Sequence, residues 1–276
     1  MGEKGEKMNI VLYILIFIMG TVFGSFFSLA IYRIPKRQDI THTPSYCPNC
    51  NHKLSFLDLI PIFSYIFLLG KCRYCKAKIR PRYFILEILS GLTFVIIAYL
   101  MNIHNLDPML LVEGVFMALY LCFIFIMAGI DIENRKIEKS ISMYGVLLSI
   151  VYILYLCMIE QEYIYRYVIY LALYVIILIL DTVTLKRYAK NSYAYGLIFT
   201  VLTMAIFTGE YVVMNTIIMT ALVVAIKLLM HKMKNIGKRI RREQKDYGKN
   251  ISYGFILGIT NILNLIFVLA WYKFFV

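Results

Sequence analysis

The feature that most constrains this chain is a series of long apolar runs. Residues 10–32 are 23 consecutive positions without a charge, enough for a helix to cross a hydrocarbon layer of roughly 30 Å. Seven more runs lie near 85–103, 109–130, 141–159, 165–181, 194–208, 211–230 and 251–272. Unpaired backbone groups are costly in lipid, so each run is expected to be helical. The predicted fold class is an all-α polytopic membrane protein with about eight transmembrane helices.

The composition excludes the other broad classes. Hydrophobic residues make up 61% of the chain and charged residues 16%, with a mean hydropathy of +0.73. A disordered chain or a water-soluble domain would be far more polar. The first run ends in no small-residue cleavage site, which predicts a membrane anchor instead of a removed signal peptide.

The basic residues predict the orientation in the membrane. Of the 29 Lys and Arg residues, 24 lie in segments 33–84, 131–140, 182–193 and 231–250. The positive-inside rule makes these segments cytoplasmic and the N-terminus external, in a multi-pass protein of the cell membrane. The formal charge of +13 then reflects topology, and the expected environment is membrane lipid, with no nucleic acid. An acidic-lipid or nucleic-acid site in 231–250 is the alternative.

A small domain is inserted after the first predicted helix. Segment 33–84 changes abruptly to Pro, Cys, Lys, Arg and Asn. The predicted organisation is therefore an N-terminal tail and first helix in 1–32, a cytoplasmic domain in 33–84 and a seven-helix membrane domain in 85–276.

Four cysteines in that insert have the spacing of a zinc site. Two Cys-x-x-Cys pairs are separated by 21 residues and comprise Cys47, Cys50, Cys72 and Cys75. Four thiolates complete a tetrahedral Zn²⁺ shell, so neighbouring His42 and His52 are not needed. A cytosolic location disfavours stable disulfides. The predicted insert is zinc-ribbon-like, and a redox pair or unliganded thiols are the alternatives.

Three blocks of sequence resemble the type IV prepilin peptidase family. They are FGSFFSLAIYRIP at 23–35, DLIPIFSY at 58–65 between the cysteine pairs, and IRPRYFILEILSG at 79–91. Their order is that of the family. The likeness is weaker from 132 onward, where SYGFILG at 252–258 lacks both prolines of the corresponding block.

The resemblance implies a bifunctional enzyme of the cytoplasmic membrane. Members remove the basic leader from prepilins or pseudopilins and methylate the new N-terminal amine with S-adenosylmethionine. Their peptidase is a GxGD-type intramembrane aspartyl protease with two aspartates at the cytoplasmic border. Two adjacent carboxylates share one proton, so one acts as a general base on water while the other donates to the scissile carbonyl.

The first of these acids is present and the second is replaced. Asp131, in the context AGID, matches the first catalytic Asp, although it also fits a solvated helix end. The GxGD block aligns with AYGLIFT at 194–200, which places Leu197 at the acid position. Asp181, at the end of the fifth predicted helix, is the substitute we can identify, and a plain helix-terminal Asp is its alternative.

The resemblance also suggests where methyl transfer takes place. The intact blocks around Gly24, Arg33 and Glu87 make these three residues the expected cofactor-binding set. A carboxylate near a helix end in lipid is costly and is a functional candidate, so Glu87 is expected to hold the cationic donor or the substrate amine. The alternative is a structural pair with Arg82 or Arg33.

The predicted function is that of a prepilin leader peptidase and N-methyltransferase family member whose peptidase half is impaired. A first alternative is a non-proteolytic relative that only methylates or binds prepilins. A second is a membrane scaffold of a pilus or secretion system that uses the zinc domain for docking.

Overall fold

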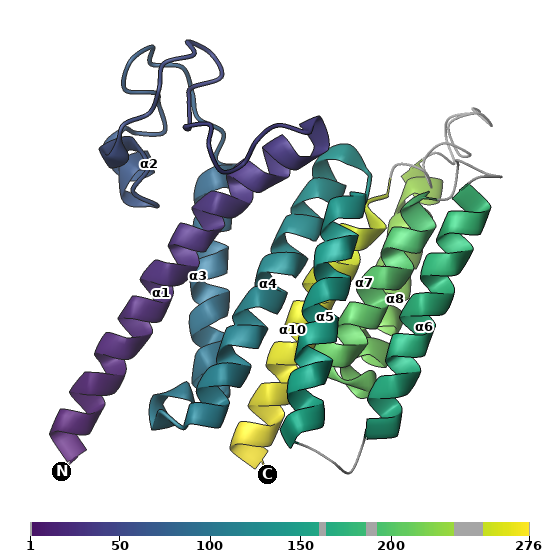
Figure 1. Cartoon of the computed structure of the whole chain (residues 1–276). Coiled ribbons are helices and arrows are strands. Elements are labelled where there is room, and N and C mark those ends of the chain that lie inside the picture. Colours follow the sequence, from purple (N-terminus) through teal and green to yellow (C-terminus); the bar gives the residue numbers. More distant parts are fainter. Residues whose placement is uncertain (1, 160–163, 186–191, 235–250, 276) are drawn as a thin grey trace. The chain divides into compact units, whose positions relative to one another are not determined.

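The chain folds into long helices joined by short connections. The computed structural model describes residues 2–159, 164–185, 192–234 and 251–275. The long helices are α1 Gly2–Arg33, α3 Arg82–Leu100, α4 Pro108–Asn134, α5 Lys139–Ile159, α6 Ile164–Leu185, α7 Ser192–Thr208, α8 Glu210–Lys234 and α10 Tyr253–Phe275 (Figure 1). Short elements are η1 Ile34–Lys36, η2 Phe56–Asp58, α2 Phe63–Phe67 and η3 Ile103–Asn105.

The predicted membrane-spanning runs are all helical. Within the described ranges, six helices are long and apolar enough to cross a bilayer, and two shorter apolar helices cover Tyr167–Leu180 and Tyr193–Thr208. These are the eight runs found in the sequence, with ends that differ by a few residues. No strand longer than an isolated bridge occurs in the described part of the chain. The all-α polytopic fold class is confirmed.

The helices form two compact units. The first comprises Met1–Ile126 and Lys273–Val276, and the second comprises Met127–Tyr272. Helix α4 is continuous across the boundary, so its last turns belong to the second unit.

Small residues allow α1 and α3 to cross closely in the first unit. A Cβ atom built on Gly20 would lie 2.8 Å from the Cα of Gly91, and one on Gly24 would lie 2.1 Å from Ser90 Oγ. Ser90 Oγ also donates to the Gly20 carbonyl at 2.8 Å. Gly20 and Gly24 form the small-xxx-small spacing that brings helices together in lipid, where close packing and interhelical hydrogen bonds drive association.

Hydrogen bonds between buried side chains connect the helices of the second unit. The Tyr174 hydroxyl of α6 lies 3.1 Å from Ser149 Oγ of α5 and 2.9 Å from Thr203 Oγ1 of α7. In α10, fully buried Asn261 donates to Thr216 of α8 at 3.4 Å. Such contacts satisfy polar groups that lipid cannot solvate.

Candidate functional site

The four cysteines of the insert come together as one cluster. The Sγ atoms of Cys47, Cys50, Cys72 and Cys75 all lie within 4.8 Å of one another. The Cys47 and Cys75 sulfurs are 3.9 Å apart. Zn–S bonds of about 2.3 Å in a tetrahedron require sulfurs roughly 3.8 Å apart. The donor set and its dimensions therefore fit a tetrahedral metal ion.

Two matching turns build this cluster. After the first pair, Asn51 has a φ of 55° and donates its amide to the Cys47 carbonyl at 2.8 Å. After the second, Lys76 has a φ of 59° and donates to the Cys72 carbonyl at 3.0 Å. The left-handed residue turns the chain back sharply, so both sulfurs of a pair face the same point.

Neither histidine near the first turn joins the cluster. The His52 ring packs against the Tyr74 ring at a tilt of 35°, and the His42 ring lies 2.8 Å from Thr41 Oγ1 and 3.4 Å from Asp39. Four cysteines form the cluster without them, as expected from the sequence.

Asp58 connects the loop between the turns to the second turn. Its side chain is 3% exposed and accepts hydrogen bonds from Ser55 Oγ at 2.7 Å and Arg73 Nε at 2.6 Å. Burial raises the pKa of this carboxyl, but the hydrogen bonds from Ser55 and Arg73 outweigh it and bring the pKa to about 2. Asp58 is therefore ionised at neutral pH and links the loop to the second cysteine turn through Arg73.

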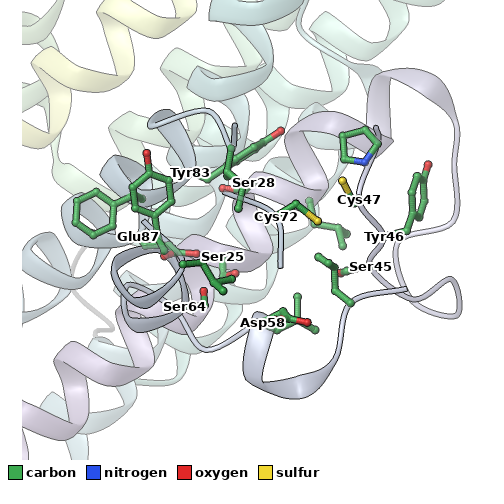
Figure 2. A pocket seen from close by; sticks show the side chains of 18 of the residues that line it. Ser25, Ser28, Ser45, Tyr46, Cys47, Asp58, Ser64, Cys72, Tyr83 and Glu87 are labelled. Atoms are coloured by element: carbon green, nitrogen blue, oxygen red, sulfur yellow. The ribbon is translucent and has the colours of Figure 1, made fainter. Parts of the chain in front are cut away.

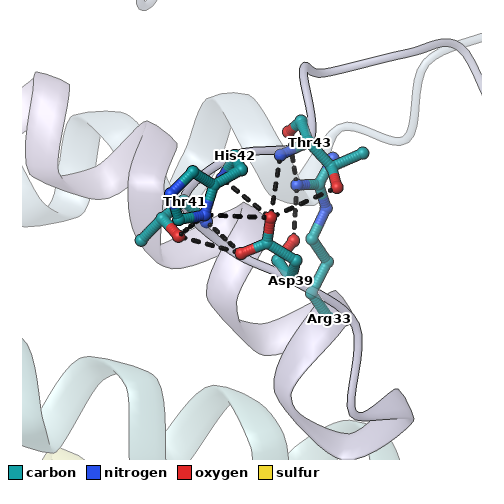
Figure 3. A network of polar contacts seen from close by, with 5 residues as sticks. All are labelled: Arg33, Asp39, Thr41, His42 and Thr43. Atoms are coloured by element: carbon teal, nitrogen blue, oxygen red, sulfur yellow. Dashed lines mark hydrogen bonds and ion pairs between the residues drawn. The ribbon is translucent and has the colours of Figure 1, made fainter.

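Arg33 fixes the connection between α1 and the insert. The residue is 3% exposed, and its guanidinium donates to the carbonyls of Asp39, Thr43 and Pro44 at 2.7–2.9 Å. The Asp39 carboxylate in turn accepts the amides of Thr41 and His42, as Figure 3 shows. These bonds, with the Thr41 amide first, lower the pKa of Asp39 to about 2.

A cavity of about 250 Å³ lies in the first unit between α1, the insert and α3. Its lining includes Arg33, Asp58 and Glu87, with the aromatic rings of Tyr32, Tyr46, Tyr65, Tyr83 and Phe84. Figure 2 shows Glu87 and Ser25 on one side and the sulfurs of Cys47 and Cys72 on another. A buried carboxylate among aromatic rings suits a cationic group, because both attract positive charge.

Glu87 is held in this wall by a backbone donor. It is 9% exposed, and one carboxylate oxygen accepts the Ile62 amide at 2.7 Å. In the part of the chain with described side chains, the carboxylate has no ion pair. The pair with Arg82 or Arg33 considered from the sequence is therefore not formed. Gly24 faces α3 at Glu87 and Ser90, where a side chain would clash with α3. Close packing therefore explains a glycine at this position.

Asp131 lies in the second unit and is completely buried. Its Oδ2 accepts the Phe255 amide at 3.0 Å, at the start of α10. Its Oδ1 is buried without a hydrogen-bond partner among the described residues. A Cβ on Gly254 would lie 3.2 Å from Oδ2, so the glycine in SYGFILG allows this approach.

Tyr193 of α7 is a partner of Asp131 that the sequence did not reveal. Its hydroxyl accepts the amides of Tyr253 at 3.0 Å and Gly254 at 3.3 Å, and it interacts with the Asp131 carboxyl. Leu197 is four residues further along α7, on the same helix face. That spacing is the signal that would have pointed to Tyr193. The Asp181 side chain lies outside the described part of the structure.

Comparison with known proteins finds a family model that matches part of the first unit, and several similar proteins. Residues 18–101 match the model of the bacterial peptidase A24 N-terminal domain. A prepilin leader peptidase/N-methyltransferase of Vibrio cholerae is 32% identical over 157 residues, which is 53% of this chain and 58% of that protein. One from Klebsiella pneumoniae is 30% identical over 134 residues, or 46% and 56%.

A further relative of the same name, from Myxococcus xanthus, is 38% identical over 81 residues, covering 29% of this chain and 24% of that protein. The match thus spans a little over half the length of the Vibrio and Klebsiella proteins. No solved structure matches the chain significantly. The segment matched by the family model contains α1 from its middle, the four-cysteine insert and α3 with Glu87, so this part of the chain is similar to the N-terminal domain of bacterial A24 peptidases.

Proposed function

We propose that the chain is a prepilin leader peptidase/N-methyltransferase of the cytoplasmic membrane that acts on type IV prepilins or pseudopilins. The observation that carries the proposal is the cavity beside Glu87, which lies within the segment matched by the family model. Relatives with that name are 30–38% identical to the chain over 81 to 157 residues.

Glu87 is the residue that recognises a cation in this cavity. S-adenosylmethionine supplies a methyl group on a positively charged sulfur. The Glu87 carboxylate provides the opposite charge for this sulfur or for the substrate's N-terminal amine, and the neighbouring rings exclude water. Arg33 positions segment 39–44 beside the site, and Gly24 lets α1 approach Glu87.

The four cysteines hold one structural Zn²⁺ ion. Their spacing in space fits Zn–S bonds, and the insert has little apolar core of its own, since its large apolar side chains are mostly exposed. The metal then supplies much of the folding free energy of the insert.

The insert faces the cytoplasm and the N-terminus is external. This orientation follows from the concentration of Lys and Arg in 33–84, 131–140, 182–193 and 231–250. It places the ends of α1 and α3 that flank the cavity at the cytoplasmic border, where a prepilin leader is located. The division into 1–32, 33–84 and 85–276 describes the same organisation.

The peptidase half is impaired. Leucine at position 197 cannot carry a proton, so Asp131 lacks the partner acid that the family chemistry needs. Asp181 is the remaining candidate for a second acid.

Labelled methyl transfer to a prepilin in proteoliposomes tests the proposal. We expect wild type to transfer methyl to the N-terminus of a precleaved pilin, and Glu87→Gln to lose at least about 100-fold, since removing a buried charge partner costs several kcal/mol. Glu133→Gln, on the exposed end of α4, is the matched control with full activity. Absence of methyl transfer by wild type, with zinc bound and the chain folded, would overturn the assignment.

A further inference from the structure

The segment between the two cysteine pairs exposes a group of large apolar side chains. In residues 56–69, hereafter the apolar loop, Phe56, Phe67 and Leu69 are 81%, 80% and 82% exposed. Leu57, Leu59, Phe63 and Ile66 are also exposed. Contiguous apolar surface of this kind marks a contact with a partner or a membrane.

The apolar loop is attached to the first turns of a membrane helix. The Ile62 amide donates to Glu87 at 2.7 Å, and the Tyr65 ring stacks on Phe84 with centroids 4.9 Å apart. Glu87 lies five residues beyond the start of α3 at Arg82, which is roughly 7 Å along the helix axis. The loop is thus held beside the first turns of α3, and in Figure 1 α2 lies at about the level of these turns.

Helix α3, to which the loop is attached, also exposes apolar side chains. On α3, Ile85, Leu89 and Leu92 are exposed on a helix apolar enough to span a bilayer. Ile85 directly follows Phe84, which packs against the loop. A bilayer that covers Ile85 and Leu89 therefore borders the turn of α3 that contacts the loop through Phe84.

Charge is arranged as an interfacial segment requires. Asp58 is the one charged residue in 56–69, and its carboxylate is turned inward onto Ser55 and Arg73. The nearest charges on either side along the chain are Lys53 and Lys71, both exposed. An uncharged apolar surface flanked by lysines is typical of segments at the boundary between headgroups and acyl chains.

We propose that the apolar loop inserts into the cytoplasmic leaflet of the bilayer, so that the zinc domain is anchored to the membrane through Phe56, Phe63, Phe67 and Leu69. Peripheral segments of this type bury their apolar face about 5–10 Å below the headgroups. The insertion holds the cavity with Glu87 at the membrane border. It does not depend on either enzymatic activity.

Tryptophan quenching by lipids measures this insertion directly. The chain has a single tryptophan, Trp271, so a Trp271→Phe background is silent. Phe67→Trp in that background is reconstituted as the full chain into phosphatidylcholine vesicles whose acyl chains carry bromine just below the headgroups. The control is Lys53→Trp, exposed in the same domain, and zinc content equal to that of the parent verifies the fold.

We expect Phe67→Trp to be quenched at least about threefold more than Lys53→Trp and to emit at shorter wavelength, since its ring lies among acyl chains. Leu69→Trp gives the same result and serves if Phe67→Trp does not retain zinc. Emission at the long wavelength of the control would overturn the proposal. Blue-shifted emission without quenching would also overturn it, because protein, from this chain or a second copy, would then cover the loop.

Discussion

In each unit a buried carboxylate on a long helix accepts a backbone amide, with different consequences. In the first unit, Glu87 accepts the Ile62 amide and lines a cavity. In the second, Asp131 accepts the Phe255 amide at the start of α10 and is fully enclosed. A carboxylate at a helix N-terminus stabilises the helix, whereas one in a cavity wall is available to a ligand. Burial of an acid in a membrane helix therefore does not by itself show that a ligand can reach it, and the cavity distinguishes Glu87 from Asp131.

Metal removal gives the largest expected effect and applies to the first unit alone. We expect about one zinc per chain, and Cys72→Ser should release it and unfold the insert, because structural zinc contributes on the order of 10 kcal/mol. Elemental analysis and proteolysis of 33–84 provide the measurements. Cys122→Ser, which changes a buried thiol of α4 outside the cluster, should keep the metal. If wild type prepared without chelator contains no zinc, the four cysteines do not form a structural zinc site.

An acid introduced at position 197 tests the proposal that the peptidase half is impaired. We expect no leader cleavage by wild type and measurable cleavage by Leu197→Asp, since Leu197 shares a face of α7 with Tyr193, which interacts with Asp131. The gain should be several powers of ten in rate, each worth about 1.4 kcal/mol of barrier.

The controls for this experiment are Leu197→Asn and Leu197→Asp combined with Asp131→Asn, both of which should stay inactive. Cleavage by wild type that disappears in Asp181→Asn would make Asp181 the second acid. Strong cleavage that persists in Asp131→Asn would show that the acid pair of the family does not operate in this chain.

In both units, the sequence predicted local features better than contacts between distant residues, for physical reasons. Cys-x-x-Cys turns and 20-residue apolar runs are local patterns, so the cysteine cluster and the eight helices could be derived from spacing alone. The contact of Asp131 with Phe255 joins residues 124 positions apart and uses a backbone amide, which no residue type reveals. The hydrogen bond from the Ile62 amide to Glu87 could not be predicted from the sequence for the same reason.

A smaller effect is expected from Gly24→Ala, and it separates packing from cofactor binding. The added methyl would lie 2.1 Å from Ser90 Oγ and 2.8 Å from the Glu87 Cα, which should cost about 1–3 kcal/mol of stability by overpacking. Thermal unfolding and methyl transfer should decline together. Gly114→Ala, which meets the flexible tip of Ile103, is the control with a smaller loss. Full stability with lost methyl transfer would instead place Gly24 in the cofactor site.

The smallest expected effect concerns Asp58, which ties the apolar loop to the second cysteine turn. Asp58→Asn loses the ionic bond to Arg73 and should cost about 1–2 kcal/mol, the scale of a hydrogen bond to a charged group, so amides of 71–79 should exchange roughly tenfold faster. The pKa of this carboxyl lies below its ordinary value, at about 2. Its stabilisation is therefore complete above about pH 4 and declines only as the pH falls toward 2. Hydrogen exchange of wild type and Asp58→Asn at pH 6 and pH 8 should accordingly show the same ratio, corrected for intrinsic rates. If the ratio of the exchange rates of Asp58→Asn and wild type changes between these two pH values, a group other than Asp58 stabilises the turn.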